Sequence, residues 1–320
     1  MTSKTKVVFL DDQEYAFRNS PEIAVLSNRG YFSFFHGPLT PSELVSEMAE
    51  AEVLVLMRDR TAISANELKH AKRLKAIVYT GNRNNRLDAQ ACQDLGIQVL
   101  NTEFGPSKSA TAELTWALIL ASLKKLEAGF ANIRQTDRDW RQGIEFPHLT
   151  QVLEGETFGV IGLGVIGQKV AKVAQAFGMQ VLAWSPNLTE DRARASAVEL
   201  VSKMELLRRS KVVTLHMVLS PSTQHLLKED ELLSMRSDSL LVNTSRSALI
   251  NEDALLSALA AGRPAMAALD VFDVEPLSDD HPFRTMPNVT MTPHLGFVAN
   301  PVYATFTETV AKHLDGLLPR

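Results

Sequence analysis

The chain has 320 residues, about twice the length of an ordinary domain, so two domains are expected. Apolar residues make up 45% and charged residues 22% of it, which excludes a disordered, collagen-like or coiled-coil protein. The net charge of −4 gives no electrostatic support for a nucleic-acid partner, and the single cysteine, Cys92, excludes an internal disulfide.

Short apolar segments alternate with helical patterns in the first hundred residues. The predicted strands are residues 7–10, 31–35, 53–57, 76–79 and 97–100. Helical patterns lie between them, at residues 42–51 and 88–95. Near-continuous apolar strands separated by helices are typical of a parallel sheet covered on both faces. This part of the chain therefore predicts a first α/β domain.

A long helix is predicted over residues 109–126, where it would cross from one domain to the next. A second series of apolar strands follows, at residues 158–161, 181–184, 212–215, 240–242, 265–271 and 289–291. This series predicts a second doubly wound parallel sheet. The last predicted element is an amphipathic helix over residues 300–318, which could pack on either domain.

A glycine-rich turn follows the first strand of the second series. It reads Gly162-Leu163-Gly164-Val165-Ile166-Gly167, and a helix begins inside it. In such a turn the first glycine permits the sharp bend, the second lets a diphosphate approach the backbone, and the third lets helix and strand pack closely. The strand before it and the helix after it favour dinucleotide binding over an ordinary tight turn.

The carboxylate expected about 20 residues after such a turn, where it would bind the adenosine ribose, is missing. The next strand ends in Trp184-Ser185-Pro186-Asn187. Because this turn has no carboxylate, nothing in it would repel the 2′-phosphate of NADP. The turn also has no arginine to bind that phosphate, since the first arginines, Arg192 and Arg194, lie several residues further on. NAD is therefore the preferred cofactor, and NADP stays open.

Polar residues that can carry chemistry follow three strands of the second series. Arg246 ends the segment 243–246, Glu275 lies in 270–276, and His294 lies in 292–296. Because the carboxyl ends of parallel strands meet at one edge of the sheet, these side chains should gather where the dinucleotide would lie.

Together these motifs resemble the D-isomer-specific 2-hydroxyacid dehydrogenase family, which includes phosphoglycerate dehydrogenases and glyoxylate or hydroxypyruvate reductases. The resemblance runs from about residue 80 to residue 296 and is most specific in 162–167, 243–246, 269–276 and 292–296. It implies a Rossmann domain inserted in a flavodoxin-like substrate domain. It also implies an oxidoreductase that transfers hydride between a nicotinamide cofactor and a small D-2-hydroxy acid or 2-oxo acid.

The resemblance further implies roles for single residues. Arg246, Glu275 and His294 are the catalytic trio. The residues expected at the cofactor, besides Gly162, Gly164, Val165, Ile166 and Gly167, are Ser185, His216, Thr244, Ser245, Asp270 and Gly296. Of these, Asp270 lies beside the nicotinamide carboxamide. The loop Gly81-Asn82-Arg83 resembles the segment whose backbone amides hold the substrate carboxylate, which Arg246 also binds.

The chemistry of 2-oxo acid reduction suits these residue types. Hydride arriving at the carbonyl carbon leaves an alkoxide, and histidine is the natural proton donor near neutral pH. A carboxylate such as Glu275 can fix the tautomer of His294 and favour its imidazolium form. The planar fork of Arg246 can bind a carboxylate and polarise the neighbouring carbonyl, which lysine could not do with the same geometry.

The domain boundaries follow from this layout. Residues 104–293 form the dinucleotide-binding domain, while residues 1–103 and 294–320 form the substrate domain, with a cleft that could close over substrate. The resemblance implies a homodimer, paired through the helical segment 109–126. We expect no metal site, because Cys92 has no partner cysteine and the histidines lack ligand spacing.

A cytoplasmic location is expected. The lone Cys92 is typical of a reducing compartment, and the apolar run at residues 7–10 is too short for a signal peptide. The longest apolar helical stretch, residues 114–123, is too short to span a membrane, so no membrane partner is expected.

Two other functions are compatible with parts of this pattern. A formate dehydrogenase would share the architecture, but that branch of the family has glutamine where Glu275 stands. A NAD(H)-sensing binding protein on the same scaffold could keep the whole trio, so it stays open as an alternative to an enzyme. A panel of 2-oxo acids would separate the two.

Overall fold

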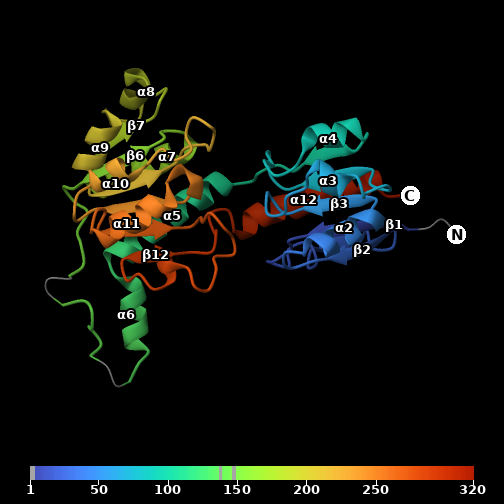
Figure 1. Ribbon diagram of the computed structural model, residues 1–320, viewed down its shortest axis with the longest axis horizontal. Coiled ribbons are helices and arrows are strands. Elements are labelled where there is room, and N and C mark those ends of the chain that lie inside the picture. The colour runs from blue at the N-terminus through green and yellow to red at the C-terminus, as the bar shows by residue number, and fades with distance from the viewer. Residues whose placement is uncertain (1–3, 137–138, 146–148) are drawn as a thin grey trace. The chain divides into compact units, whose positions relative to one another are not determined.

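The computed structural model describes residues 4–136, 139–145 and 149–320. It divides the chain into two compact units (Figure 1). Unit 1 comprises Met1–Ser107 and Ala299–Arg320, and unit 2 comprises Lys108–Val298. The second unit is therefore an insertion in the first.

These boundaries lie a few residues later than the expected ones at 103/104 and 293/294. Phe104 belongs to unit 1 because its ring packs 6.3 Å from that of Phe306, measured between centroids. His294 belongs to unit 2 because its side chain and the turn around it bond to Glu275 and Asp270. The substrate domain expected at residues 294–320 thus begins at Ala299.

Unit 1 is a five-stranded parallel sheet with the order β2-β1-β3-β4-β5. Its strands are β1 Thr5–Leu10, β2 Gly30–Phe34, β3 Val53–Leu56, β4 Ala76–Tyr79 and β5 Gln98–Asn101. Its helices are α1 Pro21–Ala24, α2 Pro41–Glu50, α3 Ala65–Leu68, α4 Ala89–Asp94 and α12 Asn300–Leu317. This strand order is the flavodoxin-like one, as expected.

The C-terminal helix α12 packs in unit 1. Figure 1 shows it in red among the blue elements of that unit, and it contacts α1. Cys92, on α4, is completely buried among apolar side chains of the same unit. Burial raises the pKa of its thiol to about 11, so it is an unreactive core residue.

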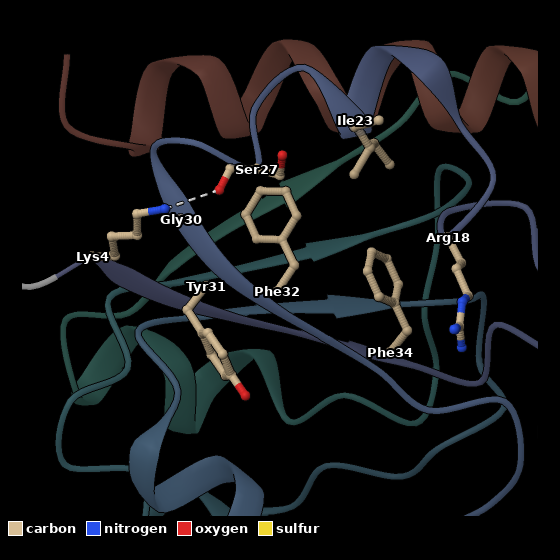
Figure 2. A pocket seen from close by; sticks show the side chains of 9 residues that line it. Lys4, Arg18, Ile23, Ser27, Gly30, Tyr31, Phe32 and Phe34 are labelled. Carbon is tan, nitrogen blue, oxygen red and sulfur yellow. Dashed lines mark hydrogen bonds between the residues drawn. The ribbon is translucent and has the colours of Figure 1, made fainter.

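Strand β2 lies at the edge of the sheet and packs against α1 through aromatic side chains. Figure 2 shows Phe32 and Phe34 on the side of β2 where Ile23 of α1 lies. The Phe34 ring also stacks on that of Phe9, with 4.5 Å between centroids. A pocket of about 410 Å³ remains among these side chains, with Arg18 in its wall.

Unit 2 is a seven-stranded parallel sheet with the order β12-β11-β10-β9-β6-β7-β8. Its strands are β6 Thr157–Ile161, β7 Gln180–Trp184, β8 Glu199–Leu200, β9 Val212–Leu215, β10 Leu240–Asn243, β11 Met266–Leu269 and β12 Val289–Met291. Strand order reverses between β6 and β9, and the crevice at such a reversal is where doubly wound domains bind ligands. Both expected parallel-sheet domains are therefore confirmed.

The helices of unit 2 cover both faces of this sheet. They are α5 Ser107–Leu123, α6 Leu126–Ile133, α7 Val165–Ala176, α8 Glu190–Ala195, α9 Lys203–Arg209, α10 Glu229–Leu233 and α11 Glu252–Ala260, with short 3₁₀ helices η1 Ser247–Leu249 and η2 Pro282–Arg284. Neighbouring residues of β10 face opposite cores, Val242 one and Leu241 the other. Burial on both faces explains the continuous apolar strands.

The helix expected over residues 109–126 is confirmed as far as Leu123, but its predicted end is wrong. Helix α5 ends at Leu123, and α6 begins at Leu126 after Lys125, whose φ of +52° is left-handed. A residue in that conformation interrupts the helical hydrogen bonds.

None of the helices in the described residues has both the length and the apolar character that a membrane span requires.

Candidate functional site

The glycine turn lies between β6 and α7, at the reversal of strand order. Gly162 has a φ of +100°, and a Cβ on it would lie 2.6 Å from the carbonyl oxygen of His216. A Cβ on Gly167 would overlap the carbonyl oxygen of Gly162. Helix and strand therefore pack too closely here for any side chain, as the motif requires.

The middle glycine leaves open space. A Cβ on Gly164 would meet no atom within 4 Å, and no side chain caps α7 at this residue. Val165 is half exposed at the start of α7, while Ile166 packs against the core. Open space before uncapped N–H groups of a long helix fits the diphosphate of a dinucleotide.

His216 follows β9 and lies against the glycine turn. Its backbone N–H donates to the Ile161 carbonyl oxygen at 2.8 Å. Its Nε2 is buried and has no hydrogen-bond partner among the described residues. Burial lowers the pKa of the imidazole to about 3, so the ring is neutral near pH 7. A neutral buried nitrogen without a partner fits a site that a bound polar group completes.

The loop after β10 is held by bonds among its own residues. Asn243 Nδ2 donates to the Arg246 carbonyl oxygen at 2.9 Å, and the Ser245 N–H donates to Asn243 Oδ1 at 3.0 Å. Ser245 Oγ donates to the Met217 carbonyl oxygen at 2.7 Å, while Thr244 is buried. These bonds fix the backbone that presents Arg246, whose Nη1 donates to the Ser245 carbonyl oxygen at 2.7 Å.

Asp270 follows β11 and is completely buried. Its Oδ1 accepts from Thr292 Oγ1 at 2.6 Å and from the Leu295 N–H at 2.7 Å. Its Oδ2 accepts from the Gly296 N–H at 2.9 Å. Burial raises the pKa of this carboxyl, against the opposing effect of these donors. Asp270 therefore anchors the turn after β12, a task that the sequence did not predict.

His294 lies in that anchored turn, with a φ of +54°. Its Nδ1 is 2.8 Å from Glu275 Oε2, and Glu275 Oε1 accepts from the Phe272 N–H at 3.0 Å. Since an ionised carboxylate only accepts, Nδ1 donates and Nε2 is left for another group. The His294 side chain is 30% exposed, so that group can come from solution.

Glu275 is ionised at neutral pH. Its partial burial alone would raise the pKa, but the hydrogen bond and charge of His294 outweigh that effect. The Phe272 amide and the positive charge of Arg246 act in the same direction, and the pKa falls below its ordinary value. Arg246, Glu275 and His294 therefore come together at the carboxyl edge of the unit 2 sheet.

The expected substrate loop lies in unit 1. Gly81 has a φ of +88°, and its N–H donates to Thr102 Oγ1 at 2.8 Å, so that amide is not available to hold a carboxylate. Asn82 and Arg83 are exposed. Their part in binding substrate stays a prediction.

Sequence reasoning overlooked a cation beside this loop. A Cβ on Gly81 would overlap Nη1 of Arg58, and the guanidinium of Arg58 lies 4.4 Å from the ring centroid of Phe104. Arg58 directly follows a predicted strand, at the same sheet edge as Gly81. That position in the sequence could have indicated Arg58 as a candidate site residue.

Among the described residues, no three His, Cys, Asp or Glu side chains gather as metal ligands would.

The class of protein follows from these features: two parallel α/β units, of which the second has the strand order, glycine turn and switch point of a dinucleotide-binding domain. Residues 116–296 match the family model described as D-isomer specific 2-hydroxyacid dehydrogenase, NAD binding domain. The chain belongs to this family, and it has the nicotinamide-dinucleotide domain of the family.

Similar proteins agree with this assignment. The chain is 36% identical over 255 residues to glyoxylate reductase of Aeropyrum pernix, covering 78% of this chain and 75% of that protein. It is 38% identical over 261 residues to D-3-phosphoglycerate dehydrogenase of Methanocaldococcus jannaschii, covering 81% of this chain. The match spans only about half, 48%, of that relative.

A solved structure, phosphoglycerate oxidoreductase from Vibrio cholerae, is similar over nearly the whole chain. Its TM-score is 0.89 at 31% identity, and the match covers 98% of this chain and 99% of that one. The two-unit fold is therefore the fold of solved members of the family.

Proposed function

We propose that the protein transfers hydride between a nicotinamide dinucleotide and a small D-2-hydroxy acid, forming or reducing the corresponding 2-oxo acid. The observation that carries this proposal is the 2.8 Å bond between Glu275 and His294 beside Arg246. A protein that only bound a dinucleotide would need the glycine turn but no proton donor held by a carboxylate.

In the reduction, the bound nicotinamide supplies the hydride. Arg246 binds the substrate carboxylate and polarises the neighbouring carbonyl. Glu275 holds Nδ1 of His294, so the transferable proton is on Nε2. His294 donates this proton to the carbonyl oxygen as the C–H bond forms, and Glu275 stabilises the imidazolium before transfer. In the oxidation, the same nitrogen takes the hydroxyl proton.

The test is a panel of 2-oxo acids, namely glyoxylate, hydroxypyruvate, pyruvate and phenylpyruvate, with NADH and with NADPH. We expect cofactor consumption with at least one acid, matched by an equal amount of the D-2-hydroxy acid on a chiral column. Cofactor binding without consumption with any acid would contradict the proposal and favour a NAD(H)-sensing binding protein.

We also propose that the protein is a cytoplasmic homodimer. Helix α6 exposes Leu126, Phe130 and Ile133, and Phe130 is 58% exposed. A groove of about 1060 Å³ in the same unit is lined by Glu127, Ala128 and Ala131 of α6 and by residues 283–291. Large exposed apolar side chains next to a groove are typical of a protein interface, and a second copy of the chain would cover both.

A further inference from the structure

The turn after β7 carries no negative charge. Residues 185–189 read Ser-Pro-Asn-Leu-Thr, and the Leu188 N–H donates to the Ser185 carbonyl oxygen at 3.1 Å, closing a tight turn. The Gly162 N–H donates to the Trp184 carbonyl oxygen at 2.8 Å, which places this turn beside the glycine turn. In dinucleotide-binding domains, this is the position next to the adenosine ribose.

The side chain of Arg192 lies against this turn in the structure. Arg192 lies on α8, but its Nη1 donates to the Asn187 carbonyl oxygen at 3.3 Å. The guanidinium therefore lies against the turn, although Arg192 and Asn187 are five positions apart in the sequence. In the described part of the chain, Arg192 has no carboxylate partner, so its charge is not neutralised.

The neighbouring cations, by contrast, have carboxylate partners. Arg194 lies 3.4 Å from Asp191 and 3.9 Å from Glu190, so it occupies both acidic residues of α8. Lys203 lies 5.9 Å from the ring centroid of Trp184, but its Nζ is 2.8 Å from a carboxylate oxygen of Glu231. Of these three cations, Arg192 is the one without a carboxylate partner among the described residues, so it can take a further anion.

A hydroxyl group accompanies the cation. Ser185 is half-buried at the end of β7, where a ribose-binding carboxylate would otherwise stand, and its Oγ forms no hydrogen bond within the described residues. A serine can donate to a phosphate oxygen, whereas a carboxylate would repel it.

We propose that this turn binds the 2′-phosphate of NADP(H), with the Arg192 guanidinium and the Ser185 hydroxyl as its ligands. The proposal rests on the proposed function only insofar as a dinucleotide binds to unit 2. It reverses the preference for NAD that the sequence suggested, because the sequence did not show that Arg192 returns to the turn. Guanidinium and phosphate form paired, charge-assisted hydrogen bonds, which are strong even near a surface.

The test is a fluorescence titration of the full-length protein with NADPH and NADH in the absence of a 2-oxo acid. We expect NADPH to bind about tenfold more tightly than NADH at low salt. In Arg192→Ala this ratio falls about tenfold, while Arg194→Ala, the matched control, changes it less than about twofold. In Ser185→Asp the preference turns toward NADH. The same titration with 2′-phospho-ADP-ribose and ADP-ribose, which lack the nicotinamide, should give the same ratios.

Equal affinity for NADPH and NADH, unchanged in Arg192→Ala, would overturn this inference and leave the proposed hydride transfer standing. If the ratio of NADPH affinity to NADH affinity falls as much in Arg194→Ala as in Arg192→Ala, Arg192 is not the specific ligand of the 2′-phosphate. Failure of both nucleotides to bind would instead contradict the proposed function itself.

Discussion

His294 has a left-handed backbone, which few residues other than glycine adopt, and a buried carboxylate holds it there. Asp270 binds the N–H groups of Leu295 and Gly296, directly after His294 in the chain. The Gly296 carbonyl oxygen accepts from Thr111 Oγ1 of α5 at 2.8 Å. In the proposed mechanism, the position of His294 therefore depends on Asp270 and Thr111, which hold the turn that carries it.

Replacing Asp270 with Asn should loosen this turn. The amide group has one acceptor atom instead of two, so the N–H of Leu295 or Gly296 loses its partner at a cost of about 1–3 kcal/mol. We expect a lower melting temperature and a kcat reduced about tenfold or more. Asp273→Asn, an exposed carboxylate nearby, is the control. Wild-type kcat in Asp270→Asn would show that the turn does not depend on this carboxylate.

Glu275 makes stability depend on pH in the acid range. Because its pKa is lowered from 4.5 on folding, its ionised form stabilises the native state above about pH 4.5. This contribution is lost as the pH falls through the lowered value. The difference in unfolding midpoint between wild type and Glu275→Gln should therefore shrink as the pH falls below 4.5. A difference that grows on acidification would contradict the assigned sign.

At the scale of elements, the two last glycines of the turn should respond differently to alanine. Gly167→Ala places a methyl group against the Gly162 carbonyl oxygen, so β6 and α7 must separate and the melting temperature should fall by several degrees. Gly164→Ala adds a methyl group in open space, so stability should stay close to wild type. Its nucleotide affinity should fall about tenfold or more, because the methyl group fills the path of the diphosphate. Tight binding by Gly164→Ala would place the diphosphate elsewhere.

The central predicted strands, such as β3, β9 and β10, are completely buried, which leaves a continuous apolar run in the sequence. Strand β8 was missed because it has only two residues, Glu199 and Leu200. The helix break at Lys125 could not be predicted, since lysine is an ordinary helix former and carries no turn signal.

For the candidate site, the sequence predicted which residues lie at the sheet edge but not the contacts that depend on tertiary structure. Arg246, Glu275 and His294 each follow a strand, so their common edge follows from the parallel sheet. The return of Arg192 to the turn after β7 depends on the path of α8 and on one side-chain conformation. The anchoring by Asp270 depends on which backbone N–H groups face it, which sequence does not encode locally.

At the scale of the whole molecule, the apolar surface of α6 bears on the proposed homodimer. Phe130→Glu would place a charge in the proposed interface and should convert the dimer into monomers, as measured by light scattering. Val25→Glu, on an equally apolar and 71% exposed position of unit 1, is the control. A monomeric wild-type protein, or dimers unaffected by Phe130→Glu, would contradict this surface as the interface.

The central claim is that His294 is the proton donor of a hydride-transfer enzyme. The most direct test is His294→Asn, assayed for turnover of the best 2-oxo acid and, separately, for nucleotide affinity. We predict that turnover falls by about 10²–10⁴-fold while nucleotide affinity changes less than about twofold, because the glycine turn does not involve the imidazole. Turnover equal to wild type would contradict the account.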